Sequence, residues 1–123
     1  MPAVPSSWYS VVIDCADIKR ESAFWAEALG YDVVFEAEDE IAIAKDDHTE
    51  PGLVFVPVPE GKTVKNRLHI DLNPDDQAAE VARLEALGAK RVDIGQGDVR
   101  WIVMADPEGN EFCVVRPKAT LTT

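Results

Sequence analysis

This sequence lacks long apolar runs, a signal peptide and the cysteine pattern of a disulfide framework. No run approaches the roughly 20 apolar residues that a membrane-spanning helix needs. The stretch Met1–Ser7 lacks the basic region and apolar core of a secretory signal peptide. Cys15 and Cys113 lie far apart in the sequence, which favours reduced, buried thiols over a disulfide framework. Together these absences predict a cytoplasmic protein without a membrane span.

Basic residues are also few, since 12 Lys and Arg stand against 23 Asp and Glu and the net charge is −11. Nucleic acids and anionic membranes are bound mainly through Lys and Arg, so this balance argues against both as partners. A small cationic ligand is compatible with the charge but is not required by it. The 123 residues, 46% of them hydrophobic, predict a single domain that buries roughly two thirds of its unfolded surface.

The most informative stretch is Asn66–Asp76, which predicts a strand that runs into a helix. Apolar and polar residues alternate over 67–72, the period-two pattern of a half-buried strand. We expect Leu68, Ile70 and Leu72 to face the core, and the outward row to consist of Arg67, His69 and Asp71. Asn73 is predicted to cap the helix, with Pro74 first and Asp75 and Asp76 in its first turn. The outward row is the candidate site, and the alternative is a solvated sheet face with an ordinary histidine.

The first half of the chain predicts a strand, a helix and three further strands. The expected strands are Trp8–Cys15, Tyr31–Glu36, Ile41–Lys45 and Leu53–Val58. The helix is expected over Ile18–Leu29, capped by Asp17 and ended by Gly30. Its buried stripe is predicted to comprise Ile18, Ser22, Trp25 and Leu29, flanked by Phe24 and Ala28. His48, in an acidic loop, is expected to be a solvated surface residue.

After a basic connector at residues 61–65 the same pattern starts again. The expected strands are Arg67–Leu72, Lys90–Ile94, Arg100–Ala105 and Glu111–Val115, and the helix is Pro74–Leu87, with Ala78, Val81, Leu84 and Leu87 on its inner face. Both helices end in the residues Glu-Ala-Leu-Gly, at 27–30 and 85–88. Each half is too small to hold a good core alone. We therefore predict an α+β fold of two βαβββ modules, about residues 8–58 and 66–115, within one domain.

Four segments together resemble the vicinal oxygen chelate superfamily, which includes glyoxalase I, bleomycin-resistance proteins and extradiol dioxygenases. They are Val12–Asp17 with the helix to Gly30, Asn66–Leu72, Ala86–Ala89 and Asp106–Phe112. Their order and spacing most closely resemble the small bacterial glyoxalase-like domain proteins. The resemblance implies that the two modules form a curved mixed sheet, which cups a small-molecule site, commonly in a homodimer.

Metalloenzymes of this superfamily take metal ligands from the first and last strands of each module, typically His or Gln and then Glu. The matching positions here are Ser10, Val54 or Val56, His69 and Cys113. Only His69 is a good ligand, so we expect no metal bound in the usual way and no ordinary glyoxalase I activity. One alternative is a rearranged site drawn from His69, Asp71, Glu111 and Cys113. The other is that a neighbouring carboxylate holds His69 as a polar anchor in a pocket.

Three functions remain open at this point. The first is metal-independent binding of a small molecule in a pocket with an apolar and aromatic lining. Its expected ligand-binding residues are Trp8, Ser10, Asp14, Val56, Arg67, His69, Trp101 and Cys113, with Val12 and Val54 beside them. The second is a lyase or isomerase for a carbonyl compound, with His69 either as acid–base, partnered by Asp14, Asp71 or Glu111, or as the sole retained metal ligand. The third is a structural or regulatory dimer with a vestigial pocket.

Overall fold

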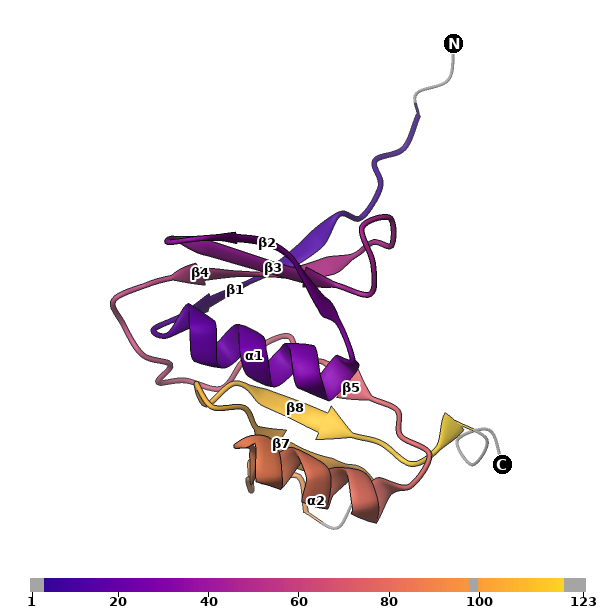
Figure 1. Ribbon diagram of the computed structural model, residues 1–123. Helices are drawn as coiled ribbons and strands as arrows, with labels where there is room; N and C mark the ends of the chain where they lie inside the picture. Colours follow the sequence, from indigo (N-terminus) through magenta and orange to yellow (C-terminus); the bar gives the residue numbers. More distant parts are fainter. Residues whose placement is uncertain (1–3, 98–99, 119–123) are drawn as a thin grey trace. The chain divides into compact units, whose positions relative to one another are not determined.

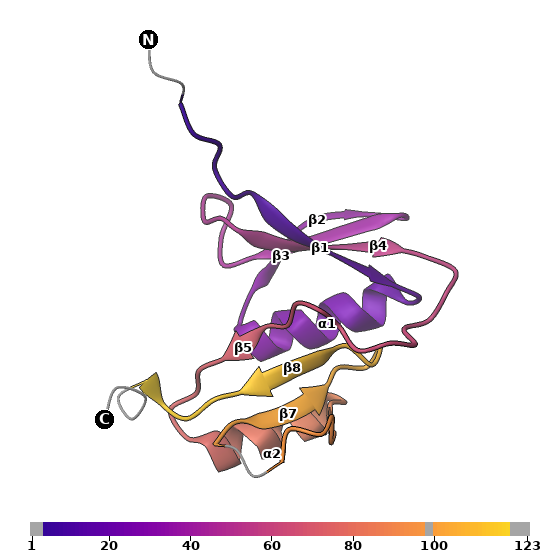
Figure 2. The same ribbon diagram turned by 180° about the vertical axis from the view of Figure 1, so that it is seen from behind.

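The computed structural model describes residues 4–97 and 100–118, and these contain the order β-α-β-β-β twice (Figures 1 and 2). The first half comprises β1 (Ser10–Cys15), α1 (Ile18–Leu29), β2 (Asp32–Ala37), β3 (Glu40–Ala44) and β4 (Gly52–Pro57). The second half comprises β5 (Asp71–Leu72), α2 (Gln77–Leu87), β6 (Lys90–Arg91), β7 (Ile102–Ala105) and β8 (Glu111–Val114). The chain divides into two compact units between Glu60 and Gly61. The predicted α+β class and the repeat are confirmed.

Each unit has one mixed sheet of four strands, in the order β1-β4-β3-β2 in the first unit and β5-β8-β7-β6 in the second. The first strand of each unit is parallel to the last strand, and the other neighbours are antiparallel. The registers correspond as well, because Val12 pairs with Val54 as Asp71 pairs with Cys113. The two halves therefore share their strand order and the register between their first and last strands.

The first unit is built around α1, which covers one face of its sheet (Figure 1). The Asp17 carboxylate accepts a hydrogen bond from the Arg20 N–H at 3.1 Å, and Gly30 ends the helix at a positive φ of 68°. Trp25 is buried beside Phe24, edge to face, with ring centroids 5.2 Å apart. Both predicted helix ends are confirmed, and Leu29 is only half-buried.

The second helix begins three residues later than predicted, at Gln77. The prediction that Asn73 caps it is wrong, because the Asp76 carboxylate accepts from the Ala79 N–H at 3.0 Å while the Asn73 amide donates to the Arg116 carbonyl at 2.8 Å. Pro74 and Asp75 therefore precede the helix. A charged Asp is as good a cap as Asn and also complements the helix dipole, so the later position is favoured. Val81 and Leu84 are buried as predicted, whereas Ala78 is exposed and Leu87 half-buried.

The strand predicted over Arg67–Leu72 is confirmed only at Asp71 and Leu72. Leu72 is buried, but Leu68 is 89% exposed, so its assignment to the core is wrong. The reason lies in the backbone ahead of the strand, where the Asn66 N–H donates to the side chain of Glu111 and not to a neighbouring strand. The strand predicted over Lys90–Ile94 likewise ends at Arg91, because side chains of the following turn accept the N–H groups of Ile94 and Gly95.

Both cysteines are buried and neither forms a disulfide bond, as predicted. The turn predicted at residues 106–110 is present, and its Asp106 carboxylate accepts from the N–H groups of Glu108 and Asn110, both at 2.9 Å. Within residues 4–97 and 100–118, no helix has the length and apolar character needed to cross a membrane.

Candidate functional site

The second unit brings His69 and Asp71 together at its surface. The imidazole Nε2 lies 3.1 Å from the Asp71 Oδ1, within hydrogen-bond distance. The two side chains are 42% and 58% exposed, so a ligand in solution can reach them. Residues two apart in an extended segment point to the same side, which is why these two side chains meet.

Cys113 adds a sulfur atom to this pair. It lies opposite Asp71 in the β5–β8 register, and its N–H donates to the Ile70 carbonyl at 3.0 Å. One ligand atom from each of His69, Asp71 and Cys113 lies within 4.8 Å of the other two. We call these three side chains the His-Asp-Cys cluster. Two strand neighbours and one residue from the segment ahead of β5 therefore form a group with an imidazole, a carboxylate and a thiol.

The Cys113 thiol is buried, with 5% of the residue exposed. Burial, and then the negative charge of Asp71, raise the pKa of this thiol above its ordinary value, although Lys65 acts in the opposite direction. The thiol is therefore neutral near pH 7, and in this state Cys113 is a poor nucleophile.

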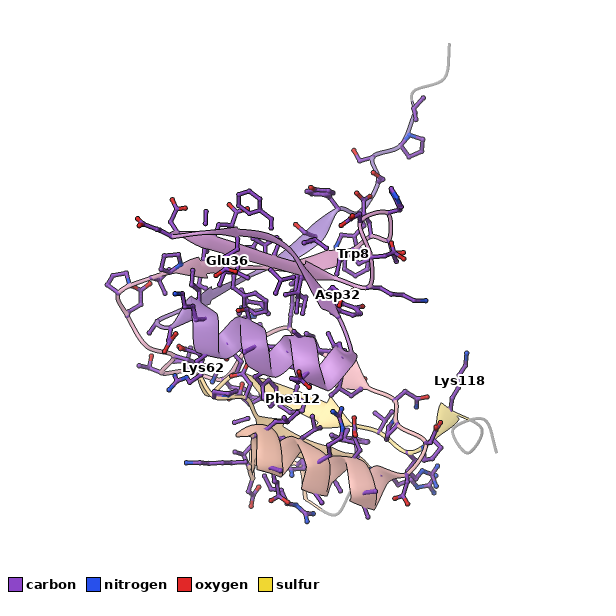
Figure 3. All side chains as sticks on the ribbon, in the orientation of Figure 1. Trp8, Asp32, Glu36, Lys62, Phe112 and Lys118 are labelled. Atoms are coloured by element: carbon purple, nitrogen blue, oxygen red, sulfur yellow. The ribbon has the colours of Figure 1, made fainter. Side chains whose placement is uncertain are left out.

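Glu111, which the sequence interpretation placed beside the cluster, is engaged elsewhere in the same unit. Its carboxylate forms an ion pair with Lys62 and accepts the Asn66 N–H at 2.8 Å. Burial raises the pKa of Glu111, but the hydrogen bonds from Lys62 and Asn66 outweigh it and hold this pKa below its ordinary value. Figure 3 labels Lys62 in the connector and Phe112, which follows Glu111 in β8. Glu111 thus secures the segment that leads to His69.

Lys62 and Asn66 were missed by the sequence interpretation. The sequence predicts only a boundary at the connector, residues 61–65, although its positive charge is a signal for a carboxylate partner. The Asn66 amide also donates to the Asn110 side chain at 3.1 Å, which ties the connector to the turn before β8. Each of these contacts joins residues more than 40 positions apart, so no local sequence pattern predicts them.

Arg67 and Trp101 both lie in the second unit and are exposed, Trp101 by 44%. Trp101 borders a cavity of about 570 Å³ whose other lining residues include Arg91, Asp93 and Gln96. It also borders a hollow of about 220 Å³ with Arg100, Val115 and Arg116. None of the three side chains of the His-Asp-Cys cluster is among the residues that line these two hollows.

The remaining predicted ligand-binding residues belong to the first unit. In the β1–β4 register, Ser10, Val12 and Asp14 lie beside Gly52, Val54 and Val56, which places their side chains on one face of the sheet. Val12 is 55% exposed on this face, and Trp8, just before β1, is 68% exposed (Figure 3). The first unit therefore presents a sheet face that is mainly apolar.

We compared the sequence with known protein families. Residues 10–115 match the family described as the glyoxalase-like domain. No protein with a curated description matches this chain with comparable significance.

Several solved structures resemble the chain. The glyoxalase I of Leishmania major has a TM-score of 0.70 and 14% identity, with 96% of this chain and 91% of that one covered. A glyoxalase/bleomycin resistance protein/dioxygenase family enzyme from Burkholderia phytofirmans PsJN has a TM-score of 0.66 and 19% identity, with 87% of this chain and 95% of that one covered. A fosfomycin resistance protein FosX from Listeria monocytogenes was solved with Mn(II) and 1S,2S-dihydroxypropylphosphonic acid. It has a TM-score of 0.67 and 14% identity, with 91% of this chain and 90% of that one covered. At these identities the likeness concerns the fold.

The four-ligand metal set that the sequence resemblance implies does not fit this chain. The register shows that Val54, and not Val56, is the counterpart of Cys113, because Val54 pairs with Val12 as Cys113 pairs with Asp71. A valine side chain has no donor atom, and the hydroxyl of Ser10 is a weak substitute for the imidazole of His69. A metal bound through all four positions is therefore incompatible with these residues.

Proposed function

Because this chain belongs to the glyoxalase-like domain family, we propose that it is a small-molecule-binding protein whose ligand contacts His69 and Asp71. It works without the superfamily's usual four-ligand metal centre. The observation that carries the proposal is the 3.1 Å contact between the His69 Nε2 and the Asp71 Oδ1 at an exposed surface. A carboxylate at this distance fixes the orientation of the imidazole, which turns a mobile side chain into a recognition group.

The chemistry of this pair indicates the kind of ligand. In a neutral ring the hydrogen on Nε2 is donated to Asp71, so Nδ1 remains as a hydrogen-bond acceptor. A ligand with a hydroxyl or amide hydrogen satisfies it, and an exposed neighbouring guanidinium, Arg67, favours a ligand that also carries an oxygen acceptor or a negative charge.

The same contact favours a second candidate, a lyase or isomerase that acts on a carbonyl compound. A histidine oriented by a carboxylate is a competent general acid–base, because the carboxylate stabilises the imidazolium that forms when the ring takes up a proton. In this candidate His69 transfers the proton and Asp71 orients it. Glu111, paired with Lys62 and Asn66, then acts as a positioning residue.

The test is a screen of small carbonyl and hydroxy compounds by ligand-dependent shifts of the melting temperature. A ligand at 100 times its Kd stabilises the folded state by about 2.7 kcal/mol, which such a screen detects. We expect His69→Ala to keep its circular dichroism spectrum and to lose the shift, while His48→Ala, which changes the only other histidine, keeps it. A shift that persists in His69→Ala contradicts the proposal. Detection of product by NMR distinguishes the enzymatic function from the binding function.

Homodimerisation and a cytoplasmic location are part of the same proposal. The exposed apolar sheet face of the first unit, on which Val12 and Phe35 are each more than half exposed, supports a partner chain. Sedimentation that shows only monomer at micromolar concentration contradicts the dimer.

A further inference from the structure

We propose that the His-Asp-Cys cluster is a binding site for one thiophilic divalent cation, of the Zn²⁺ or Co²⁺ type, formed entirely by the second unit. The site differs from the superfamily's set, since it needs no residue of the first unit and includes Asp71, which is not one of the four expected positions. The inference goes beyond the small-molecule binding proposed above and does not depend on it, because in the metal-bound state the His69 Nε2 binds the ion in place of the hydrogen that it otherwise donates to Asp71.

The spacing of the donor atoms fits such an ion. With bonds of about 2.0–2.2 Å to nitrogen and oxygen and about 2.3 Å to sulfur, the donors around a tetrahedral Zn²⁺ lie about 3.3–3.7 Å apart. The His69 Nε2 and Asp71 Oδ1 are 3.1 Å apart, and all three donors lie within 4.8 Å of one another. A side-chain adjustment of about 1 Å, well within the reach of rotamer changes, closes the site.

The donor types select the cation. One imidazole, one carboxylate and one sulfur suit Zn²⁺ and Co²⁺, whereas Mg²⁺ and Ca²⁺ prefer an all-oxygen shell. Since three side chains leave one tetrahedral position unfilled and both His69 and Asp71 are exposed, water or a ligand can take the fourth position. This arrangement is typical of open metal sites and not of closed structural ones.

The first unit provides an internal comparison. The position seven residues ahead of its helix cap is Ser10, where the second unit has His69. The strand pair equivalent to Asp71 and Cys113 is Val12 and Val54. The shared fold therefore does not require donors at these positions, and three of them occur together only in the second unit.

The test uses the chelator-treated full chain and Co²⁺ alone, without any organic ligand. We expect one equivalent of Co²⁺ to bind and to produce visible d–d bands together with a thiolate-to-cobalt charge-transfer band. Cys113→Ser should abolish the charge-transfer band. His69→Ala and Asp71→Asn, at exposed positions where folding is not at risk, should weaken binding by more than the roughly 10–100-fold that the loss of an outer-sphere partner costs.

The chain contains matched controls, because Cys15 and His48 are its only other cysteine and histidine. Cys15→Ser and His48→Ala should both bind Co²⁺ as the parent does. No charge-transfer band in the parent, or a band that survives Cys113→Ser, overturns the proposal, as does unchanged affinity in both His69→Ala and Asp71→Asn. A melting shift by an organic ligand in the presence of chelator is measured separately, so failure of the metal site and failure of small-molecule binding are distinguishable.

Discussion

The two units have the same strand order and the same register between their first and last strands, but different chemistry on the sheet face that does not contact the helix. Where the first unit has Val12 paired with Val54, the second has Asp71 paired with Cys113. The helix-facing positions are buried in both units, as Phe55 and Val114 illustrate. Packing thus constrains one face of each sheet, while the other face is free to be apolar in one unit and polar in the other.

The first strands differ as well. β1 has six residues paired with β4, whereas β5 has two paired with β8. Glu111 lies two residues before Cys113, as Gly52 lies two before Val54. A Cβ at Gly52 would lie 2.7 Å from the Ile43 carbonyl oxygen, so no side chain fits there, while the Glu111 carboxylate binds Lys62 and Asn66. In the second unit, side-chain hydrogen bonds to Glu111 stand where the first unit has backbone pairing between its first and last strands. The segment that carries His69 is therefore held by side chains and is not part of a strand.

The largest expected effect tests the shortened strand. Leu72→Ala should lower the free energy of unfolding by about 2–5 kcal/mol, because Leu72 is buried and its removal leaves a cavity. Leu68→Ala is the matched control and should change it by less than about 0.5 kcal/mol, since Leu68 is 89% exposed. Urea denaturation measures both. Comparable losses of unfolding free energy in the two variants would indicate that the strand is longer, as the alternation over residues 67–72 predicts.

A smaller effect tests the carboxylate that replaces the ladder. Glu111→Gln should cost about 1.5–3 kcal/mol at neutral pH, the usual range for hydrogen bonds to a charged group. Because folding lowers the pKa of Glu111, its contribution is complete above the ordinary pKa and is lost as the pH falls through the lowered one. The cost of Glu111→Gln should therefore shrink between about pH 7 and about pH 3. Glu38→Gln, in an exposed turn, should show little change; a cost that is independent of pH contradicts the role of the ion pair.

The smallest effect concerns a feature that the units share. Asp17→Ala and Asp76→Ala should each destabilise by about 0.5–2 kcal/mol, since each carboxylate caps its helix. Asn73→Ala should cost less, because the hydrogen bond from the Asn73 amide to the Arg116 carbonyl is exposed and Asp76 caps the helix. Thermal unfolding of the three variants gives the comparison. A greater loss in Asn73→Ala than in Asp76→Ala would show that the helix starts where the local pattern predicts.

Much of the fold could be predicted from the sequence because it depends on interactions over a few residues. The cap at Asp17, the end at Gly30 and the order of elements all follow from local hydrogen bonding and backbone preference. The second helix shows the limit of such rules. Asn73 and Asp76 are both good caps, and a tertiary contact, from Asn73 to the Arg116 carbonyl, distinguishes them.

The sequence by itself determined the repeat and singled out His69 as the strongest donor, since periodicity and residue type are visible along the chain. The tertiary structure decided which groups stand beside it. Asp71 and Cys113 lie 42 positions apart, and Glu111 reaches Lys62 across 49. Such pairs form when strand register closes a long loop, and register depends on packing of the whole sheet and not on any short stretch of sequence.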